Sequence, residues 1–246
     1  MDQSQPKVPD RSEQVDQIPT VLIPGLLCSP LLYAEQLPDL WRLGPVTLAN
    51  HCHAGDLTEL ARSILAGSPP RFTLVGLSMG GYLAFEIMRQ AAHRVDRLAL
   101  LDTTARADSP ERRARRHDQL RRVGTGQFHA VVDELYDGWV HPARVADAQL
   151  RQLVRQMADE TGPDAFGRQQ AAIMNRPDSR DGLAAIDCPT LVLVGAQDTV
   201  TPVEQARELA DAIPDARLAV IPDCGHLSTL ERPAAATRAL IDWLTP

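Results

Sequence analysis

Short apolar runs of strand length alternate with helical patterns along this chain of 246 residues. Parallel strands need a long crossover between them, usually a helix, so the alternation predicts an α/β fold: a mostly parallel sheet with helices on both faces. The runs that predict strands lie at residues 19–25, 44–50, 72–78, 95–102, 189–195 and 216–222. A chain of this length can bury one substantial core and fits one domain with an insertion.

The alternation stops between about Thr103 and Ala185, where only helical spacing recurs. It predicts helices over residues 111–123, 127–139, 144–160 and 164–175. We therefore expect an inserted helical cap over residues 104–185 and an α/β core over residues 18–103 and 186–246. Helices of the core are expected at residues 31–40, 57–66, 79–92, 202–212 and 228–244, with Asp56 as the N-cap of the second.

Composition and charge argue against a nucleic-acid partner, secretion and a position in the membrane. The formal net charge of −7 disfavours nucleic acid as a partner, because an acidic surface repels phosphate backbones. Residues 1–17 are polar, so we expect a disordered leader there and no secretory signal. Apolar runs are strand-sized, too short for a membrane span. The four cysteines form no CxxC pair and are expected to be free thiols in the cytoplasm.

The segment Gly76–Gly80 reads G-L-S-M-G and lies between an apolar strand and a helix. A G-x-S-x-G motif in this setting indicates a nucleophilic serine on a sharp strand-to-helix turn. Glycines flanking Ser78 let neighbouring backbone approach without a clash. Unsatisfied N–H groups at the helix N-terminus would face developing negative charge. We therefore expect Ser78 to be a nucleophile.

A serine hydroxyl needs a general base, and the base needs a group that fixes its tautomer. His226 follows the last expected strand within Pro222-Asp223-Cys224-Gly225-His226, where Gly225 permits a tight loop. Asp198 follows the preceding strand, so nucleophile, acid and base stand at three separate strand ends, where ligands bind in open α/β sheets. Asp102, at the end of the fourth strand, is the alternative acid.

Acyl transfer also needs hydrogen-bond donors for the oxygen that becomes negative. The backbone N–H of Met79, directly after the nucleophile, is one candidate. The loop after the first strand, Pro24-Gly25-Leu26-Leu27, offers the N–H of Leu26 as the second.

Four segments together resemble the α/β-hydrolase fold family: Ile23–Leu27, Gly76–Gly81, Gly195–Asp198 and Gly225–His226. The chain is similar to the capped, esterase-like branch that includes carboxylesterases and enol-lactonases, from about residue 18 to the end. Many relatives have His-Gly where this chain has Pro24-Gly25. Many also begin with an antiparallel hairpin that the polar leader cannot supply, so a smaller sheet is expected.

The resemblance implies a serine hydrolase that cleaves a small-molecule carboxylic ester or lactone through an acyl-enzyme. It implies a triad of Ser78, Asp198 and His226, an oxyanion hole at Leu26 and Met79, and no cofactor or metal. The same triad serves carbon–carbon bond hydrolases, thioesterases and perhydrolases. A ligand-binding receptor with residual hydrolase activity is an alternative of a different class.

Two further patterns keep two interpretations each. Six arginines between residues 112 and 122 crowd one expected helix of the cap. They indicate either a solvated helix face or a means of attracting an anionic substrate or partner. His51-Cys52-His53 suggests metal ligation, but without a third ligand a surface position is the favoured interpretation.

Overall fold

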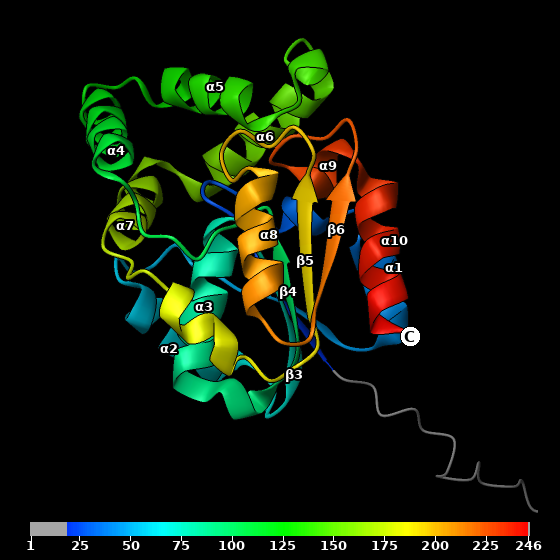
Figure 1. The fold of residues 1–246 in the computed structure, drawn as a ribbon. Coiled ribbons are helices and arrows are strands. Elements are labelled where there is room, and N and C mark those ends of the chain that lie inside the picture. Colours follow the sequence, from blue (N-terminus) through cyan, green and yellow to red (C-terminus); the bar gives the residue numbers. More distant parts are fainter. Residues whose placement is uncertain (1–18, 246) are drawn as a thin grey trace, which may run out of the picture.

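One sheet of six strands, all paired in parallel, forms the centre of the computed structural model, which describes residues 19–245 (Figure 1). Its order is β2-β1-β3-β4-β5-β6. The strands are β1 (Thr20–Ile23), β2 (Val46–Leu48), β3 (Phe72–Leu77), β4 (Val95–Leu101), β5 (Thr190–Gly195) and β6 (Ala216–Ile221). The predicted mostly parallel α/β sheet is therefore confirmed, and each expected strand forms.

The central strands are buried on both faces because helices cover the sheet from both sides. Figure 1 shows α2 (Leu57–Gly67), α3 (Met79–Ala91) and α8 (Val203–Ala212) on one side of the sheet, with α1 (Leu37–Leu43) and α10 (Pro233–Leu244) on the other. Asp56 caps α2 as expected, since its carboxylate accepts the Glu59 N–H at 3.0 Å. The parallel register brings the carboxyl ends of all strands to one edge.

Three expected helices differ from those that form. The expected helix at 31–40 is wrong: a 3₁₀ turn, η2 (Pro30–Tyr33), precedes α1, which carries Pro38 in its first turn. The segment 228–244 is two helices, α9 (Ser228–Glu231) and α10, because Pro233 lacks an N–H and begins a new helix. The segment 144–160 begins with the 3₁₀ turn η4 (Pro142–Arg144), and its helix starts after the N-cap Asp147.

Four helices between β4 and β5 lie beyond the carboxyl ends of the strands (Figure 1). They are α4 (Pro110–Gly124), α5 (Phe128–Trp139), α6 (Ala148–Thr161) and α7 (Pro163–Met174), and we call them the cap helices. Two further 3₁₀ turns are η3 (Ala92–Arg94) and η5 (Arg180–Ala185).

Two expectations concern segments at the margins of the structure. The leader expected at residues 1–17 lies outside the described residues. Of the helices formed by residues 19–245, none combines the length and the apolar character that crossing a bilayer requires.

Candidate functional site

Ser78 occupies the turn between β3 and α3 with φ of 56°, in the region that non-glycine residues rarely adopt. Backbone bonds on both sides hold this conformation. The Ser78 N–H donates to Leu101 O at 2.9 Å, and the Thr103 hydroxyl donates to Ser78 O at 2.8 Å. The strained turn is therefore fixed by the neighbouring strand β4 and the residues that follow it.

The glycines around Ser78 are required by close backbone approach. A Cβ on Gly80 would overlap the carbonyl of Ile23, and a Cβ on Gly76 would overlap the backbone of Gly80. A Cβ on Gly81 would overlap the side chain of Thr103. The motif therefore lets α3 start directly against β1, as expected from the sequence.

The structure brings the three predicted side chains into one chain of contacts. His226 Nε2 lies 2.9 Å from Ser78 Oγ, and His226 Nδ1 lies 2.7 Å from Asp198 Oδ2. With the proton assigned to Nδ1, that nitrogen donates to the carboxylate and leaves Nε2 free to accept the serine proton. His226 and Asp198 are both buried, at 2% and 4% exposure.

Charge coupling between His226 and Asp198 decides their protonation. Burial is the largest single influence and disfavours the charged form of each. The attraction and hydrogen bond between the two, together with other nearby groups, outweigh it, so the pKa of His226 is raised and the pKa of Asp198 is lowered. Asp198 also accepts the N–H groups of Val200 and Thr201 at 2.8 and 2.9 Å and the Thr201 hydroxyl at 2.7 Å. The acid is thus held as an ionised carboxylate with a fixed orientation.

Asp102, the alternative acid, has other partners. Its carboxyl group accepts the Gly195 N–H at 3.0 Å and contacts the Ser228 hydroxyl at 2.5 Å. Its side chain is fully buried, and burial, with the charge of Asp198 nearby, raises its pKa to about 8. Asp102 joins β4 to β5 and to the start of α9, while Asp198 holds the contact with His226.

Sequence reasoning missed Glu231, which organises the loop that carries His226. Its buried carboxylate accepts the N–H groups of Gly225 at 3.0 Å, His141 at 2.7 Å and Leu227 at 3.3 Å. A glutamate a few residues after a glycine-histidine pair gives no sequence signal of this role, because one partner, His141, is far away in the chain.

Of the two expected oxyanion donors, Leu26 lines a cavity together with Ser78 and His226, and Met79 directly follows Ser78 in the chain, at the start of α3. Within residues 19–245 neither amide donates a hydrogen bond to a protein acceptor. Both N–H groups are therefore available to a bound oxygen atom.

The surface position favoured for His51 is wrong. His51 is 1% exposed, and its Nε2 lies 3.0 Å from Gly25 O in the loop that carries Leu26. Burial lowers the pKa of His51 to about 4, so the ring is neutral near pH 7 and Nε2–H donates to that carbonyl. Gln169 of α7 accepts the Leu27 N–H at 3.1 Å, where Leu27 has a φ of 57°. Two residues distant in the sequence, His51 and Gln169, therefore hold the loop that carries Leu26.

The cysteines and the His51-Cys52-His53 segment provide no metal site. No group of three His, Cys, Asp or Glu side chains is arranged for a metal ion in the part of the chain that the structure describes. All four cysteines are free thiols, as expected. Cys28 borders Ser78, and burial raises the pKa of its thiol to about 12, which makes it a poor nucleophile at neutral pH.

Two cavities of unequal size meet at Ser78 and His226. The larger has a volume of about 220 Å³ and is lined by residues of α4, α5 and α7, among them the apolar side chains of Leu135, Trp139 and Ile173 together with polar ones. The smaller has a volume of about 10 Å³ and is lined mainly by apolar side chains. The larger cavity can hold the body of a small molecule, whereas the smaller has room for about one water-sized group.

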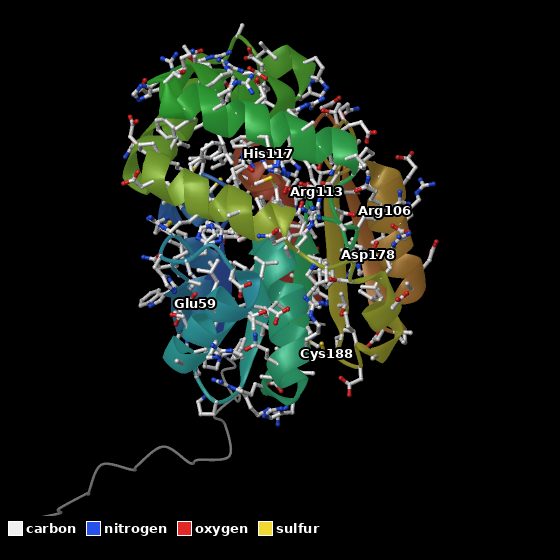
Figure 2. All side chains as sticks on the ribbon, turned by 90° about the vertical axis from the view of Figure 1, so that its left-hand side faces the viewer. Glu59, Arg106, Arg113, His117, Asp178 and Cys188 are labelled. Atoms are coloured by element: carbon white, nitrogen blue, oxygen red, sulfur yellow. The ribbon has the colours of Figure 1, made fainter. Side chains whose placement is uncertain are left out.

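The arginines of α4 divide between this cavity and the surface. Arg112, Arg115 and Arg116 line the larger cavity. Arg113 is exposed, and Figure 2, which looks onto the side of the molecule that carries α4 and α7, labels it together with His117 of the same helix. Part of the cluster is therefore a solvated helix face, and Arg115 is itself exposed although it lines the cavity. The attraction of an anionic substrate or partner stays a prediction.

Comparisons with known proteins agree with this architecture. A model of the alpha/beta hydrolase family matches residues 21–240. BpoC of Mycobacterium tuberculosis, whose name assigns it provisionally to the non-heme bromoperoxidases, is 34% identical over 68% of this chain, and the match covers 66% of BpoC, just under two thirds of its length. A pimeloyl-(acyl-carrier protein) methyl ester esterase of Nitrosomonas europaea is 30% identical over 81% of this chain and 83% of that protein.

Solved structures give the same result. A thermophilic esterase from Thermogutta terrifontis, in its malate-bound form, superposes with a TM-score of 0.83 at 30% identity, covering 92% of this chain and 89% of that one. The enol-lactonase from Burkholderia xenovorans superposes with a TM-score of 0.83 at 27% identity, covering 93% and 92%. Because the family match spans nearly the whole described chain and the sheet agrees with it, this protein belongs to the alpha/beta hydrolase family.

Proposed function

We propose that this hydrolase is a serine hydrolase that cleaves a small-molecule carboxylic ester or lactone through an acyl-enzyme. The observation that carries the proposal is the continuous contact from Ser78 Oγ to His226 Nε2 at 2.9 Å and from His226 Nδ1 to Asp198 Oδ2 at 2.7 Å. Esterase and enol-lactonase relatives of the same fold support it.

In the first step, His226 Nε2 takes the Ser78 proton as Oγ attacks the carbonyl carbon. The carbonyl oxygen becomes negative and accepts the N–H groups of Leu26 and Met79. Asp198 stabilises the imidazolium that forms. When the tetrahedral intermediate collapses, the bond to the leaving oxygen breaks, and that oxygen takes the proton from His226. Ser78 then carries the acyl group as an ester.

In the second step, water replaces the leaving alcohol. His226 takes a proton from the water as its oxygen attacks the acyl carbon, and the oxyanion again rests on Leu26 and Met79. Collapse breaks the bond to Ser78 Oγ, which regains its proton from His226. The products are the carboxylic acid and the free enzyme, with no cofactor consumed.

We also propose that residues 104–185 act as a cap over a core of residues 18–103 and 186–246. The larger cavity lies between α4, α5 and α7 on one side and Ser78 with His226 on the other. Such a cover would limit substrate size and exclude bulk water from the acyl-enzyme.

Treatment with a fluorophosphonate, followed by peptide mass spectrometry, tests the nucleophile. The adduct is expected on Ser78. Ser78→Ala should abolish both labelling and ester hydrolysis, and Ser63→Ala, which changes an exposed serine of α2, should preserve both. An adduct on another residue, or full activity in Ser78→Ala, would overturn the assignment.

Turnover and a substrate panel separate the proposed esterase from the alternatives. Esters, lactones, thioesters and carbon–carbon ring-fission substrates are compared by kcat/KM, and bromination with peroxide tests perhydrolysis. A receptor would be labelled at Ser78 yet turn over each substrate only a few times. Hundreds of turnovers of an ester or lactone, with the highest kcat/KM of the panel, is the expected result.

A further inference from the structure

One face of α4 is polar where it lines the larger cavity. Arg112, Arg115, Arg116 and Gln119 recur at the i, i+3, i+4, i+7 spacing that places side chains on one face of a helix, and all four line the cavity. A cap helix usually turns apolar side chains inward at this spacing. On α4 the inward stripe carries guanidinium groups instead.

Two of these arginines have no carboxylate partner. Arg116 pairs with Asp108 at 2.6 Å, and Glu134, the one acidic residue lining the cavity, pairs with Arg122 at 2.5 Å. In the part of the chain that the structure describes, Arg112 and Arg115 form no ion pair. The guanidinium group of Arg112 donates only to Val200 O, at 2.6 Å. The cavity beside Ser78 therefore carries positive charge that the protein does not neutralise.

The unequal cavities decide which part of a substrate meets this charge. The cavity of about 10 Å³ leaves room for only a methyl- or water-sized group beside Ser78. The larger part of a substrate must then occupy the cavity of about 220 Å³, between apolar walls and the arginines of α4. A substrate with an apolar chain that ends in an anionic group would place the chain against the apolar walls and the anion against the arginines.

We infer that the substrate is a small ester whose larger part ends in a carboxylate, and that Arg112 and Arg115 bind this carboxylate. The inference rests on the proposed serine hydrolase function and names its substrate class. Guanidinium groups bind carboxylates through paired, charge-assisted hydrogen bonds. Such bonds are stronger for a group that is partly shielded from water, as Arg112 is, whereas Arg115 lines the cavity from an exposed position.

The experiment compares esters that differ only in charge. Monomethyl glutarate carries its carboxylate on the acyl side, and the methyl ester of glutaramic acid replaces it with a neutral amide of similar size. 3-Acetoxypropanoate and its amide place the same difference on the alcohol side. In at least one pair, the wild-type protein is expected to have a kcat/KM about tenfold or more higher for the charged ester. The pair that shows it identifies the side of the ester that carries the charge.

Arg115→Gln and Arg112→Gln should each lower this charged-to-neutral ratio about tenfold, because kcat/KM should fall more for the charged ester than for the neutral one. Arg113→Gln, on the exposed face of the same helix, is the matched control and should keep the wild-type ratio. The side chain of Arg115 makes no hydrogen bond within residues 19–245, so its replacement tests the charge without removing a side-chain contact of this kind. A ratio near one in the wild-type protein for both pairs, or a wild-type ratio in Arg115→Gln, would overturn the inference.

A neutral p-nitrophenyl ester keeps this result separate from the proposed function. If Ser78-dependent hydrolysis of that ester is observed but the paired esters show no preference for the charged member, the carboxylate site is rejected and the serine hydrolase function stands. If no ester were hydrolysed in a way that depends on Ser78, both the carboxylate site and the serine hydrolase function would be rejected.

Discussion

At the scale of single residues, each reacting group of the proposed active site is held by a partner distant in the sequence. Thr103 donates its hydroxyl to the carbonyl of Ser78, and Trp139 O accepts the His226 N–H at 2.6 Å. The second contact comes from the end of α5, so a cap helix also fixes the loop of the proposed base. Positioning of this kind keeps the hydroxyl and the imidazole within reach before substrate binds.

The coupling of His226 to Asp198 predicts the pH dependence of hydrolysis. His226 accepts a proton only when it is neutral, so kcat/KM should fall as the pH drops through its pKa. Because Asp198 raises that pKa, the acidic limb should have its midpoint above 6.5, the ordinary value. Asp198→Asn should move the midpoint to lower pH and reduce kcat by about three to four orders of magnitude.

Stopped assays of kcat/KM between pH 5 and pH 9 check this prediction, with circular dichroism as the control for folding. Near wild-type activity in Asp198→Asn would assign the role of acid to Asp102 instead. An acidic midpoint that the substitution leaves unchanged would contradict the coupling between the two residues.

His51 predicts an effect on rate without direct contact to substrate. His51→Ala removes the donor to Gly25 O, so the Leu26 N–H should lose its fixed direction. We expect kcat to fall about 10- to 100-fold with KM nearly unchanged, somewhat less than the loss of a complete oxyanion donor. His53→Ala, an exposed neighbour two residues on, is the matched control. His51→Asn, which can still donate, should recover part of kcat; a KM effect alone would contradict the positioning role.

The sequence identifies the residues of a motif better than those that support it. Ser78 could be predicted because the G-x-S-x-G motif between an apolar strand and a helix marks it in the sequence itself. Asp198 and His226 could be predicted to meet it because parallel strands end at one edge. His51 and Glu231 were not predicted, because their partners lie elsewhere in the chain and the residue type alone does not name them.

At the scale of elements, the strands were predictable because two-sided burial requires continuous apolar runs, as in β3 and β5. Errors arose where proline divides a helical pattern. Apolar spacing continues through Pro38 and Pro233, but the backbone of each begins a new helix. The spacing of apolar residues shows which face of a helix is buried. It does not show where the backbone hydrogen bonds of the helix are interrupted.

The contact between α3 and β1 gives an element-scale prediction. Gly80→Ala would place a methyl group onto the backbone of Ile23 and Pro24, so we expect the free energy of unfolding to fall by about 1–3 kcal/mol or more. Gly167, inside α7, has no atom within 4 Å of an added Cβ. Gly167→Ala should therefore raise stability by about 0.5–1 kcal/mol. Urea unfolding measures both, and equal effects would show that the close approach is not limiting.

At the scale of the whole molecule, the sheet gathers groups from separate segments at one edge, and residues of α4, α5 and α7 line the larger cavity together with Ser78 and His226. The alternation of strands and helices was sufficient to predict this plan. It could not show which arginines of α4 face the cavity, because that depends on how the helix is rotated against the sheet. Location in the cytoplasm and the absence of a nucleic-acid partner stay predictions.

Asp102 connects the global stability of this assembly to pH. Its carboxyl group joins β4, β5 and α9, and burial raises its pKa to about 8, whereas the unfolded chain returns it to the ordinary value near 3.8. Between these values the folded state holds a proton that the unfolded state has lost. The contribution of Asp102 to stability is therefore complete below pH 3.8 and is lost as the pH rises through 8.

Asp102→Asn replaces the protonated carboxyl group with a neutral amide of the same shape, whose oxygen can still accept the Gly195 N–H. Its NH2 group cannot accept the Ser228 N–H as Asp102 Oδ2 does at 3.3 Å, so a loss of stability that does not depend on pH is expected as well. The variant should thus gain stability relative to the wild-type protein as the pH rises from about 4 to 8, because it has no proton to lose. Urea unfolding at intervals across this range measures the difference. Asp211→Asn, an exposed carboxylate on α8, serves as the control and should give a flat difference. If Asp102→Asn gave an equally flat difference, the carboxyl group would be ionised throughout, and the contact with Ser228 would be that of a buried carboxylate accepting the hydroxyl proton.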